Sequence, residues 1–230
     1  MGTVTAVVNL KGGSGKTTLA LCLVSAWREK GEKTVLLDAD GQGTATDILG
    51  IGAARGVDVP GIVQLPDWRL LRRQARALAE DYDRVVIDTP ARLNRTSSAA
   101  ISASELVLIP VCPGAAGHCA LGPTLDLVDE WVALADAPPR VAMVLNMVDH
   151  TRVGREHRPT VEELLEARED APLLLKAELR RRTSHNSAQS VGQSTMDYAS
   201  GGDAAHEVQA LVAELGRRRL VGKSRKSRRG

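Results

Sequence analysis

Residues 11–18 read Lys11-Gly12-Gly13-Ser14-Gly15-Lys16-Thr17-Thr18, and this stretch decides the fold. A run rich in β-branched residues, 3–9, precedes it, and the pattern of residues 16–30 predicts a helix. A strand, a glycine-rich turn and a helix in this order place backbone N–H groups around a phosphate. The sequence therefore predicts a phosphate-binding loop, in which Lys16 reaches the phosphates and Thr17 binds Mg²⁺.

Predicted strands and helices alternate along the rest of the chain. Further strands are predicted over 34–37, 84–87, 106–111, 141–145 and 173–175. Helices are predicted over 69–80, 121–134, 160–168 and 204–219, and residues 183–202 are expected to form a surface loop or weak helix. This alternation predicts an α/β fold, with a doubly wound parallel sheet flanked by helices in a single domain. Ligands of such sheets bind at the carboxyl ends of the strands.

Charge is unevenly distributed along the chain. The 30 Lys and Arg and 28 Asp and Glu give a formal net charge of +2, but residues 216–230 hold eight basic residues and no acid. We therefore predict an acidic domain at 1–215 and a basic, flexible tail at 216–230. Aromatic residues make up only 2% of the chain, which disfavours a protein that stacks bases of single strands.

Cysteine and hydropathy patterns point to a reducing compartment. The odd number of cysteines, Cys22, Cys112 and Cys119, does not suggest a disulfide framework, and no spacing matches a zinc site. The N-terminus enters a predicted strand directly, so no signal peptide is expected. No apolar run approaches the roughly 20 residues that span a bilayer.

The loop departs from the usual pattern G-x-x-x-x-G-K-[ST], because Leu10 stands where the first glycine belongs and Lys11 follows it. KGGSGKTT resembles the deviant Walker A motif of the ParA/MinD family of ATPases. The resemblance implies a P-loop NTPase-like fold, ATP and Mg²⁺ as cofactors, and nucleotide contacts from Lys11, Gly12, Gly13, Ser14, Gly15, Lys16, Thr17 and Thr18. It also implies a homodimer formed with ATP, in which Lys11 reaches the partner's nucleotide. Two lysines per triphosphate would stabilise the charge that develops during phosphoryl transfer.

Two further motifs extend the resemblance. LLDADGQGTAT, residues 36–46, resembles the first switch of the family, in which Asp40 would position the attacking water and Asp38 would support the Mg²⁺ shell. Gly41 stands where the family usually has proline, so this switch should be more mobile. VVIDTPA, residues 85–91, resembles the Walker B strand, in which Asp88 would hold Mg²⁺ through water.

A third motif concerns the base. VLNMVD, residues 144–149, resembles the strand whose asparagine reads adenine. Asn146 is therefore the candidate base-recognition residue, because an amide can both donate and accept a hydrogen bond.

Within the family, the chain is most like a small plasmid partition protein of the ParA type. Its loop begins about ten residues in, which leaves no room for an N-terminal helix-turn-helix domain. The resemblance implies slow, partner-stimulated hydrolysis of ATP to ADP and phosphate, a centromere-binding (ParB-type) partner, and a cytoplasmic, nucleoid-associated location. Non-specific binding to double-stranded DNA draws on Lys and Arg. The candidates are Arg180, Arg181, Arg182, Arg217, Arg218, Arg219, Lys223 and Arg225.

Three alternatives stay open. A MinD-like protein binds membranes through an amphipathic helix, but only Leu220 and Val221 are large and apolar after residue 216, so no stable membrane anchor is expected. A reductase related to the nitrogenase iron protein would need cluster ligands, and neither Cys112 nor Cys119 falls in a matching motif. Positioning of another cargo, such as a protein compartment, uses the same chemistry as plasmid partition, and the sequence does not separate the two.

Overall fold

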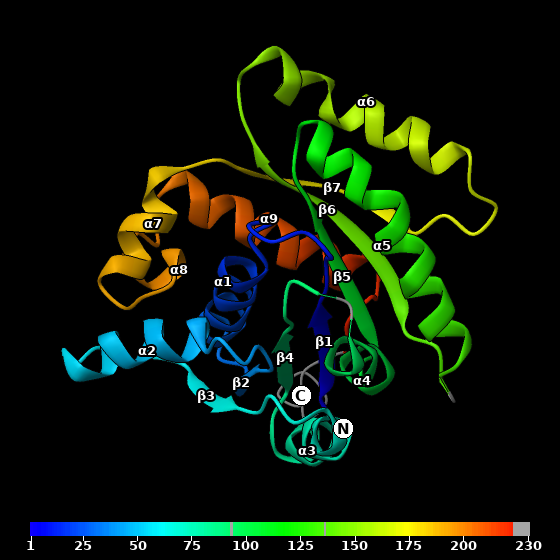
Figure 1. Cartoon of the computed structure of the whole chain (residues 1–230). Coiled ribbons are helices and arrows are strands. Elements are labelled where there is room, and N and C mark those ends of the chain that lie inside the picture. Colours follow the sequence, from blue (N-terminus) through cyan, green and yellow to red (C-terminus); the bar gives the residue numbers. More distant parts are fainter. Residues whose placement is uncertain (93, 136, 223–230) are drawn as a thin grey trace.

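The computed structural model describes residues 1–92, 94–135 and 137–222 (Figure 1). These residues form one seven-stranded sheet in the order β3-β2-β4-β1-β5-β6-β7, and every neighbouring pair is parallel. The predicted parallel α/β sheet is therefore confirmed. The strands are β1 Thr3–Val7, β2 Thr34–Asp38, β3 Gly61–Gln64, β4 Arg84–Asp88, β5 Leu106–Val111, β6 Arg140–Val148 and β7 Leu173–Arg180.

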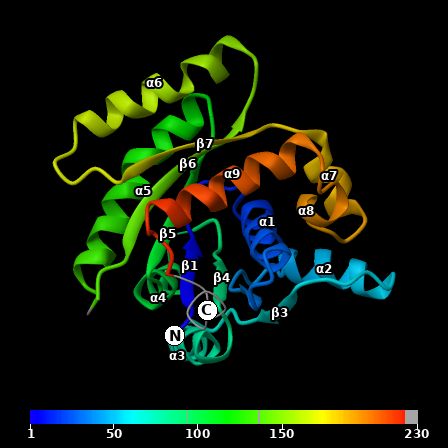
Figure 2. The ribbon, with the colours of Figure 1, turned by 180° about the vertical axis from the view of Figure 1, so that it is seen from behind.

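Helices cover both faces of this sheet, as Figures 1 and 2 show from opposite sides. One face packs against α1 Lys16–Glu29, α2 Thr44–Ala54, α8 Thr195–Tyr198 and α9 Asp203–Arg217. The other packs against α3 Trp68–Asp81, α4 Arg95–Ala103, α5 Ala115–Ala133 and α6 Arg152–Glu166. Helix α7, Thr183–Ser190, lies against α8. The arrangement is doubly wound, and the two apolar layers are almost wholly aliphatic.

The C-terminal boundary differs from the prediction. Helix α9 runs through Gly216, and the next apolar pair, Leu220 and Val221, is only 8% and 7% exposed within the core. The backbone N–H of Gly222 donates to the hydroxyl of Thr3 at 2.9 Å. Residues 216–222 therefore belong to the domain, because two large apolar side chains gain more from burial than from solvent. Residues 223–230 lie outside the described residues.

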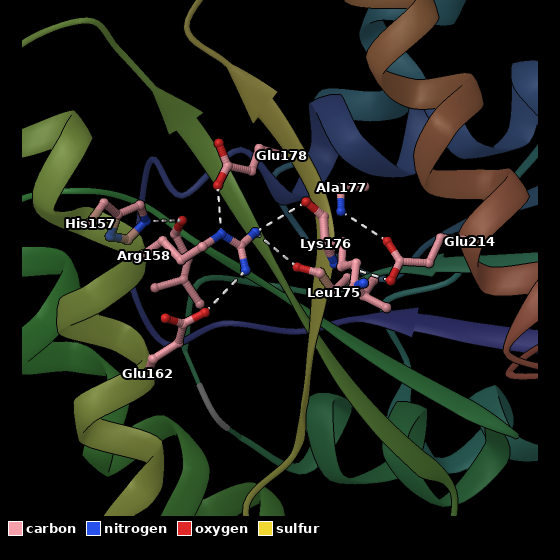
Figure 3. A network of polar contacts seen from close by, with 9 residues as sticks. His157, Arg158, Glu162, Leu175, Lys176, Ala177, Glu178 and Glu214 are labelled. Carbon is pink, nitrogen blue, oxygen red and sulfur yellow. Dashed lines mark hydrogen bonds and ion pairs between the residues drawn. The ribbon is translucent and has the colours of Figure 1, made fainter.

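Strand β7 is irregular in a way that α6 and α9 compensate. Its pairing with β6 shifts register between Met143 and Leu145, so backbone groups near residues 175–177 lose their ladder partners. Figure 3 shows two side chains that replace these partners. Glu214 of α9 accepts bonds from the N–H groups of residues 176 and 177 at 3.0 and 2.9 Å. Arg158 of α6 donates to the carbonyls of residues 175 and 176 at 3.0 and 3.1 Å.

The described residues contain no helix that combines the length and apolar character needed to cross a bilayer.

Candidate nucleotide-binding site

The predicted phosphate loop connects β1 to α1 at the carboxyl edge of the sheet. Gly13 and Gly15 adopt φ angles of +72° and +82°, which glycine tolerates and other residues rarely adopt. Gly15 is the N-cap of α1, whose first turn has no acidic residue. The free N–H groups and the positive end of the helix dipole therefore meet at this loop, which suits an anion.

Four side chains fix the shape of the loop, three from outside it and one from the loop itself. Asn9 accepts a bond from the N–H of Lys11 at 2.7 Å, while its amide donates to a β5 carbonyl at 2.7 Å. The carbonyl of Ser14 accepts from Asn146 Nδ2 at 2.8 Å and from Cys112 Sγ at 3.4 Å. The fourth, Lys16, donates through Nζ to a carbonyl of the loop itself at 3.3 Å. The loop is therefore held in shape by the protein alone.

Lys16 is the charged group at the centre of the site. Its side chain starts in the first turn of α1, and the residue is only 6% exposed. Burial lowers the pKa of Lys16, and the nearby charges of Asp88 and Asp40 oppose this shift. Two motifs that are far apart in the sequence therefore meet at Lys16, as the parallel sheet predicted.

Asp88 ends β4 and is the least satisfied polar residue of the site. It is 1% exposed, and neither carboxylate oxygen has a hydrogen-bond partner of normal geometry among the described residues, although the Thr17 side chain faces it. Burial raises the pKa of Asp88 to about 7, Thr17 lowers it, and the charge of Asp38 raises it further. A buried carboxylate without a partner is costly, and a divalent cation held beside it would remove that cost. Asp88 and Thr17 therefore fit the predicted Mg²⁺ site.

Asp38 ends β2 and holds the segment that follows it. Its Oδ2 accepts from the N–H and the hydroxyl of Thr46 at 3.0 and 2.9 Å, and its Oδ1 accepts from the N–H of Asp40 at 3.2 Å. The Asp38 carboxylate thus anchors the first turn of α2, whose N-cap, Gly43, has no side chain to do so. Its expected part in the Mg²⁺ shell stays a prediction.

Asp40 is placed differently from Asp38. It is partly exposed, its Oδ1 accepts from the N–H of Gln42 at 3.0 Å, and its charge acts on Lys16 and Asp88. The carboxylate therefore lies at the edge of the phosphate site, where water can reach it. Its water-positioning role stays a prediction that this placement supports.

A hollow of about 150 Å³ beside the loop is the candidate base pocket. Asn146 lines it, but the Nδ2 of this side chain already donates to the loop carbonyl, which leaves Oδ1 for a ligand. Met147 next to it has a φ of +56°, a strained conformation that is common at binding sites. The other described residues of the wall are Thr18, Leu19, Cys22, Leu179, Arg180, Arg181, Arg182, His185, Asn186 and Val208.

The structure places the basic residues that are predicted to bind DNA in two separate regions. Arg180 is the last residue of β7, and Arg181 and Arg182 follow it. Arg217 ends α9 and, with Arg219, lines a hollow beside Thr3 and Arg140, the first residues of β1 and β6. Lys223 and Arg225 lie outside the described residues. The first group also lines the base pocket, so it belongs to the nucleotide edge of the molecule.

Two of these arginines are neutralised by acids of α9. Arg182 pairs with Asp203 at 2.8 Å and Glu207 at 2.6 Å, and Arg218 pairs with Glu214 at 2.7 Å. Both arginines therefore have acidic partners in this structure, and their predicted role in DNA binding stays a prediction. Helix α9 presents its acids on the side that faces β7, which the sequence alone did not show.

Sequence reasoning missed several contacts beside the site. The hydroxyl of Thr89, 1% exposed, donates to the Val7 carbonyl at 2.7 Å and ties the residue after β4 to β1. His157 of α6 is fully buried, with its Nε2 3.0 Å from the Val111 carbonyl and its Nδ1 2.9 Å from Nε2 of His118. Burial lowers the pKa of both imidazoles. The only sequence signal was a histidine within an otherwise polar stretch of α6.

Comparison with known proteins identifies the family. The model of the CobQ/CobB/MinD/ParA nucleotide binding domain matches residues 5–195, which include the loop, Asp40, Asp88 and Asn146. The chain belongs to this family. The predicted resemblance is confirmed, and nucleotide binding is the property that the whole family shares.

Relatives differ in how much of the chain they match. Two proteins named maintenance of carboxysome distribution protein A match nearly throughout. The protein of Halothiobacillus neapolitanus is 27% identical over 91% of this chain and 94% of its own length. The protein of Gloeobacter kilaueensis is 32% identical over 90% of this chain and 89% of its own length. The sporulation initiation inhibitor protein Soj of Bacillus subtilis is 30% identical over 48% of this chain. The chain spans 58% of that Soj and 53% of the chromosome-partitioning ATPase Soj of Thermus thermophilus.

Solved structures confirm the fold. The apo structure of McdA from Cyanothece superposes with a TM-score of 0.76 at 16% identity, covering 94% of this chain and all of the other. The cell division ATPase MinD of Pyrococcus furiosus gives 0.73 at 20% identity, covering 94% and 99%. Cobyrinic acid a,c-diamide synthase of Mycobacterium smegmatis, solved with an ATP analog and magnesium, gives 0.73 at 19% identity, covering 97% and 98%.

Proposed function

We propose that the chain hydrolyses ATP, dimerises when ATP is bound, and binds double-stranded DNA without sequence preference to segregate plasmid or chromosomal DNA. The observation that carries the ATPase part is the meeting of Lys16, Asp40 and Asp88 at a preformed phosphate loop. The fold is that of a synthase solved with an ATP analog and magnesium, which supports ATP and Mg²⁺ as the ligands.

Each part of the site has a role in this proposal. The N–H groups of residues 12–18 bind the triphosphate, Lys16 contacts its terminal phosphates, and Asn146 Oδ1 accepts from the adenine amino group. Asp88 and Thr17 hold Mg²⁺, which neutralises phosphate charge when bound. Asp40 orients a water molecule for in-line attack on the γ-phosphorus, and ADP is the leaving group.

Lys11 is the residue on which the dimer depends. Replacing Lys11 with alanine is expected to abolish ATP-dependent dimerisation, since a second cation would then be missing at the partner's phosphates. The side chain is partly exposed and near Cys112, which follows β5, and His118 of α5, so it lies at the rim of the site. Sedimentation velocity with and without ATP measures the effect.

The exposed Lys30, at the other end of α1, provides the matched control, and Lys30→Ala should dimerise as the parent does. If Lys11→Ala dimerises with ATP as well as the parent, the cross-subunit role is wrong.

DNA is a better-supported partner than a membrane. Leu220 and Val221, the two large apolar residues of the expected tail, are buried in the core and do not face solvent. The basic residues 223–230 can attract anionic lipid, but a stable anchor needs apolar insertion as well. We propose a ParB-type protein as the partner that stimulates hydrolysis, and a cytoplasmic location on the nucleoid.

A second cargo is supported by the relatives that match almost the whole chain. Both carry the name maintenance of carboxysome distribution protein A, whereas the two Soj proteins match over about half of this chain. The same ATP-driven cycle could then position a protein compartment on the nucleoid. Proteins that co-purify with the chain distinguish between these two cargoes.

Parallel pelleting assays test the proposal. With ATP and Mg²⁺, the chain should co-sediment with DNA of any sequence, release it as salt rises, and stay in solution with anionic liposomes. Deleting residues 223–230 should weaken DNA binding without unfolding the protein, because the buried residues up to 222 remain. Binding to liposomes but not to DNA would replace this proposal with the MinD-like alternative.

A further inference from the structure

Helix α3 presents a stripe of arginines that the motifs did not single out. Arg69, Arg73 and Arg76 are exposed at helical spacing, while Leu71 and Ala75 on the opposite side are fully buried. Residues spaced by three or four positions share one helix face, and this stripe extends over about 10 Å. The stripe is therefore a surface feature, independent of the core.

The stripe borders two hollows that join at Ser102. The first, of about 460 Å³, lies between α3, α4 and α5 and is lined by Trp68, Arg69, Arg95 and Trp131. The second, of about 980 Å³, lies at the amino-terminal edge of the sheet. Its described lining includes the arginines Arg76, Arg140, Arg217 and Arg219. A continuous arginine-lined surface thus runs from the start of α3 to the end of α9, which we name the α3 surface.

The arginines outnumber the acids along this surface, although Glu80 and Asp81 are exposed at the end of α3 and Glu80 stands four residues after Arg76. Glu105 is the one acid among the described residues that line the two hollows, and its Oε2 is engaged by the N–H of Val4 at 2.6 Å. Asp67 approaches Arg69 at 3.7 Å, but that arginine side chain is 70% exposed, so the pair is weak. The α3 surface therefore carries more positive than negative charge.

Trp68 holds part of the α3 surface in place. The guanidinium of Arg69 lies 5.3 Å and that of Arg95 5.2 Å from the centre of its ring. Cation–π contacts at this distance order flexible side chains without neutralising them. Arginines fixed in this way keep their fork-shaped donors for bidentate contacts with phosphate.

We infer that the α3 surface is where this chain contacts the phosphates of double-stranded DNA, an inference that rests on the proposed DNA binding. Arg182 is paired with two acids and its neighbours line the base pocket, so they do not compete for this role. Arg140 begins β6, and Gly222 is bonded to the first residue of β1. The part of the α3 surface at the amino-terminal edge of the sheet thus lies opposite the phosphate loop, where dimerisation through Lys11 leaves it open.

The test is the salt dependence of DNA binding with ATP. A plot of the logarithm of the DNA association constant against the logarithm of salt concentration has a negative slope. The triple variant Arg69→Gln, Arg73→Gln and Arg76→Gln is expected to make that slope shallower by about 2 to 3. Affinity near 0.15 M salt should fall about 10- to 100-fold. The matched control removes three exposed arginines elsewhere and should keep the slope within about 0.5 of the parent. Its substitutions are Arg55→Gln, Arg152→Gln and Arg155→Gln.

Other outcomes overturn the inference. An equal loss in both triple variants would assign the effect to net charge. If Arg180→Gln with Arg182→Gln loses DNA while the α3 variant keeps it, DNA binding stands but lies at the other edge. Poly-L-glutamate that displaces DNA at equal charge would identify an acidic protein as the partner. A parent chain that binds no DNA with ATP would remove the proposed DNA function itself.

Discussion

Replacing Asp40 with alanine is expected to lower the rate of ATP hydrolysis by about 100-fold or more, while ATP-dependent dimerisation persists. Asp40 lies at the solvent edge of the site and acts on Lys16 only through its charge. Among the described residues no hydrogen bond ties the Asp40 side chain to the phosphate loop, and its Oδ1 accepts from the N–H of Gln42. Its loss should therefore remove the alignment of water and leave triphosphate binding in place. Phosphate release and sedimentation velocity measure the two effects separately.

Two neighbouring aspartates sharpen this experiment. Asp47, exposed in the first turn of α2, is the matched control, and Asp47→Ala should hydrolyse ATP at nearly the parent rate. Asp38→Ala should impair both hydrolysis and dimerisation, because it frees Thr46 and the start of α2. If Asp40→Ala hydrolyses ATP normally, another group positions the water.

The central strands could be predicted because burial on both faces leaves a sequence signal. β1, β2, β4 and β5 are buried at every position, and their runs of Val, Leu and Ile have no other explanation. β3 was missed for the opposite reason. It is an edge strand of four residues, Gly61–Gln64, three of them exposed, so its sequence carries little apolar pattern.

Helices were missed or shortened where small residues or proline hide their period. The apolar positions of α2 are mixed with Gly50 and Gly52, and Gly52 packs so closely on Gly192 that any side chain would collide with it. Prolines stand inside α5 and α6, and the predicted helices began near Pro123 and Pro159 instead of at residues 115 and 152. Residues 183–202, expected to be a surface loop or weak helix, contain the short helices α7 and α8, which contact α1 through Gln189 and Asp197.

The candidate site also has features that leave a pattern in the sequence and features that do not. Lys16 and Asp88 stand in separate motifs at the carboxyl ends of parallel strands, so the topology alone predicts that they meet. Contacts between distant segments left no such signal, including the Asn9 amide on the Pro110 carbonyl and Cys112 Sγ on the Ser14 carbonyl. A charge in the sequence also does not reveal its partner, which is why the pairing of Arg182 with α9 was not predicted.

Replacing Glu214 with glutamine is expected to lower the free energy of unfolding by about 2 to 4 kcal/mol at neutral pH. Glu214 is 4% exposed, and its oxygens accept bonds from the N–H groups of Lys176 and Ala177 and from Arg218 Nε at 3.0, 2.9 and 2.7 Å. Glutamine would turn an NH₂ group toward one of these donors. Denaturant unfolding measures the loss, with the exposed Glu163→Gln on α6 as control.

The pH dependence of that loss separates charge from shape. Burial alone would raise the pKa of Glu214, but the bonds from Lys176, Ala177 and Arg218 lower it below its ordinary value. The carboxylate therefore stabilises the fold above the unfolded pKa of about 4.3, and this contribution disappears as pH falls through the lower folded pKa. The difference between parent and Glu214→Gln should be large at pH 7 and shrink below about pH 4. A constant difference would mean that packing, and not charge, is lost.

The Glu214→Gln substitution should also weaken nucleotide binding. Glu214 and Arg158 hold the irregular middle of β7 from its two sides (Figure 3), and the end of that strand supplies Leu179 and Arg180 to the base pocket. Loosening β7 should weaken nucleotide affinity more than it slows hydrolysis of bound ATP, because Asp40 and Lys16 are anchored on β2 and α1. Titration with a fluorescent ATP analogue, compared with single-turnover hydrolysis, distinguishes the two. If both fall equally, β7 supports the whole phosphate site and not the base pocket alone.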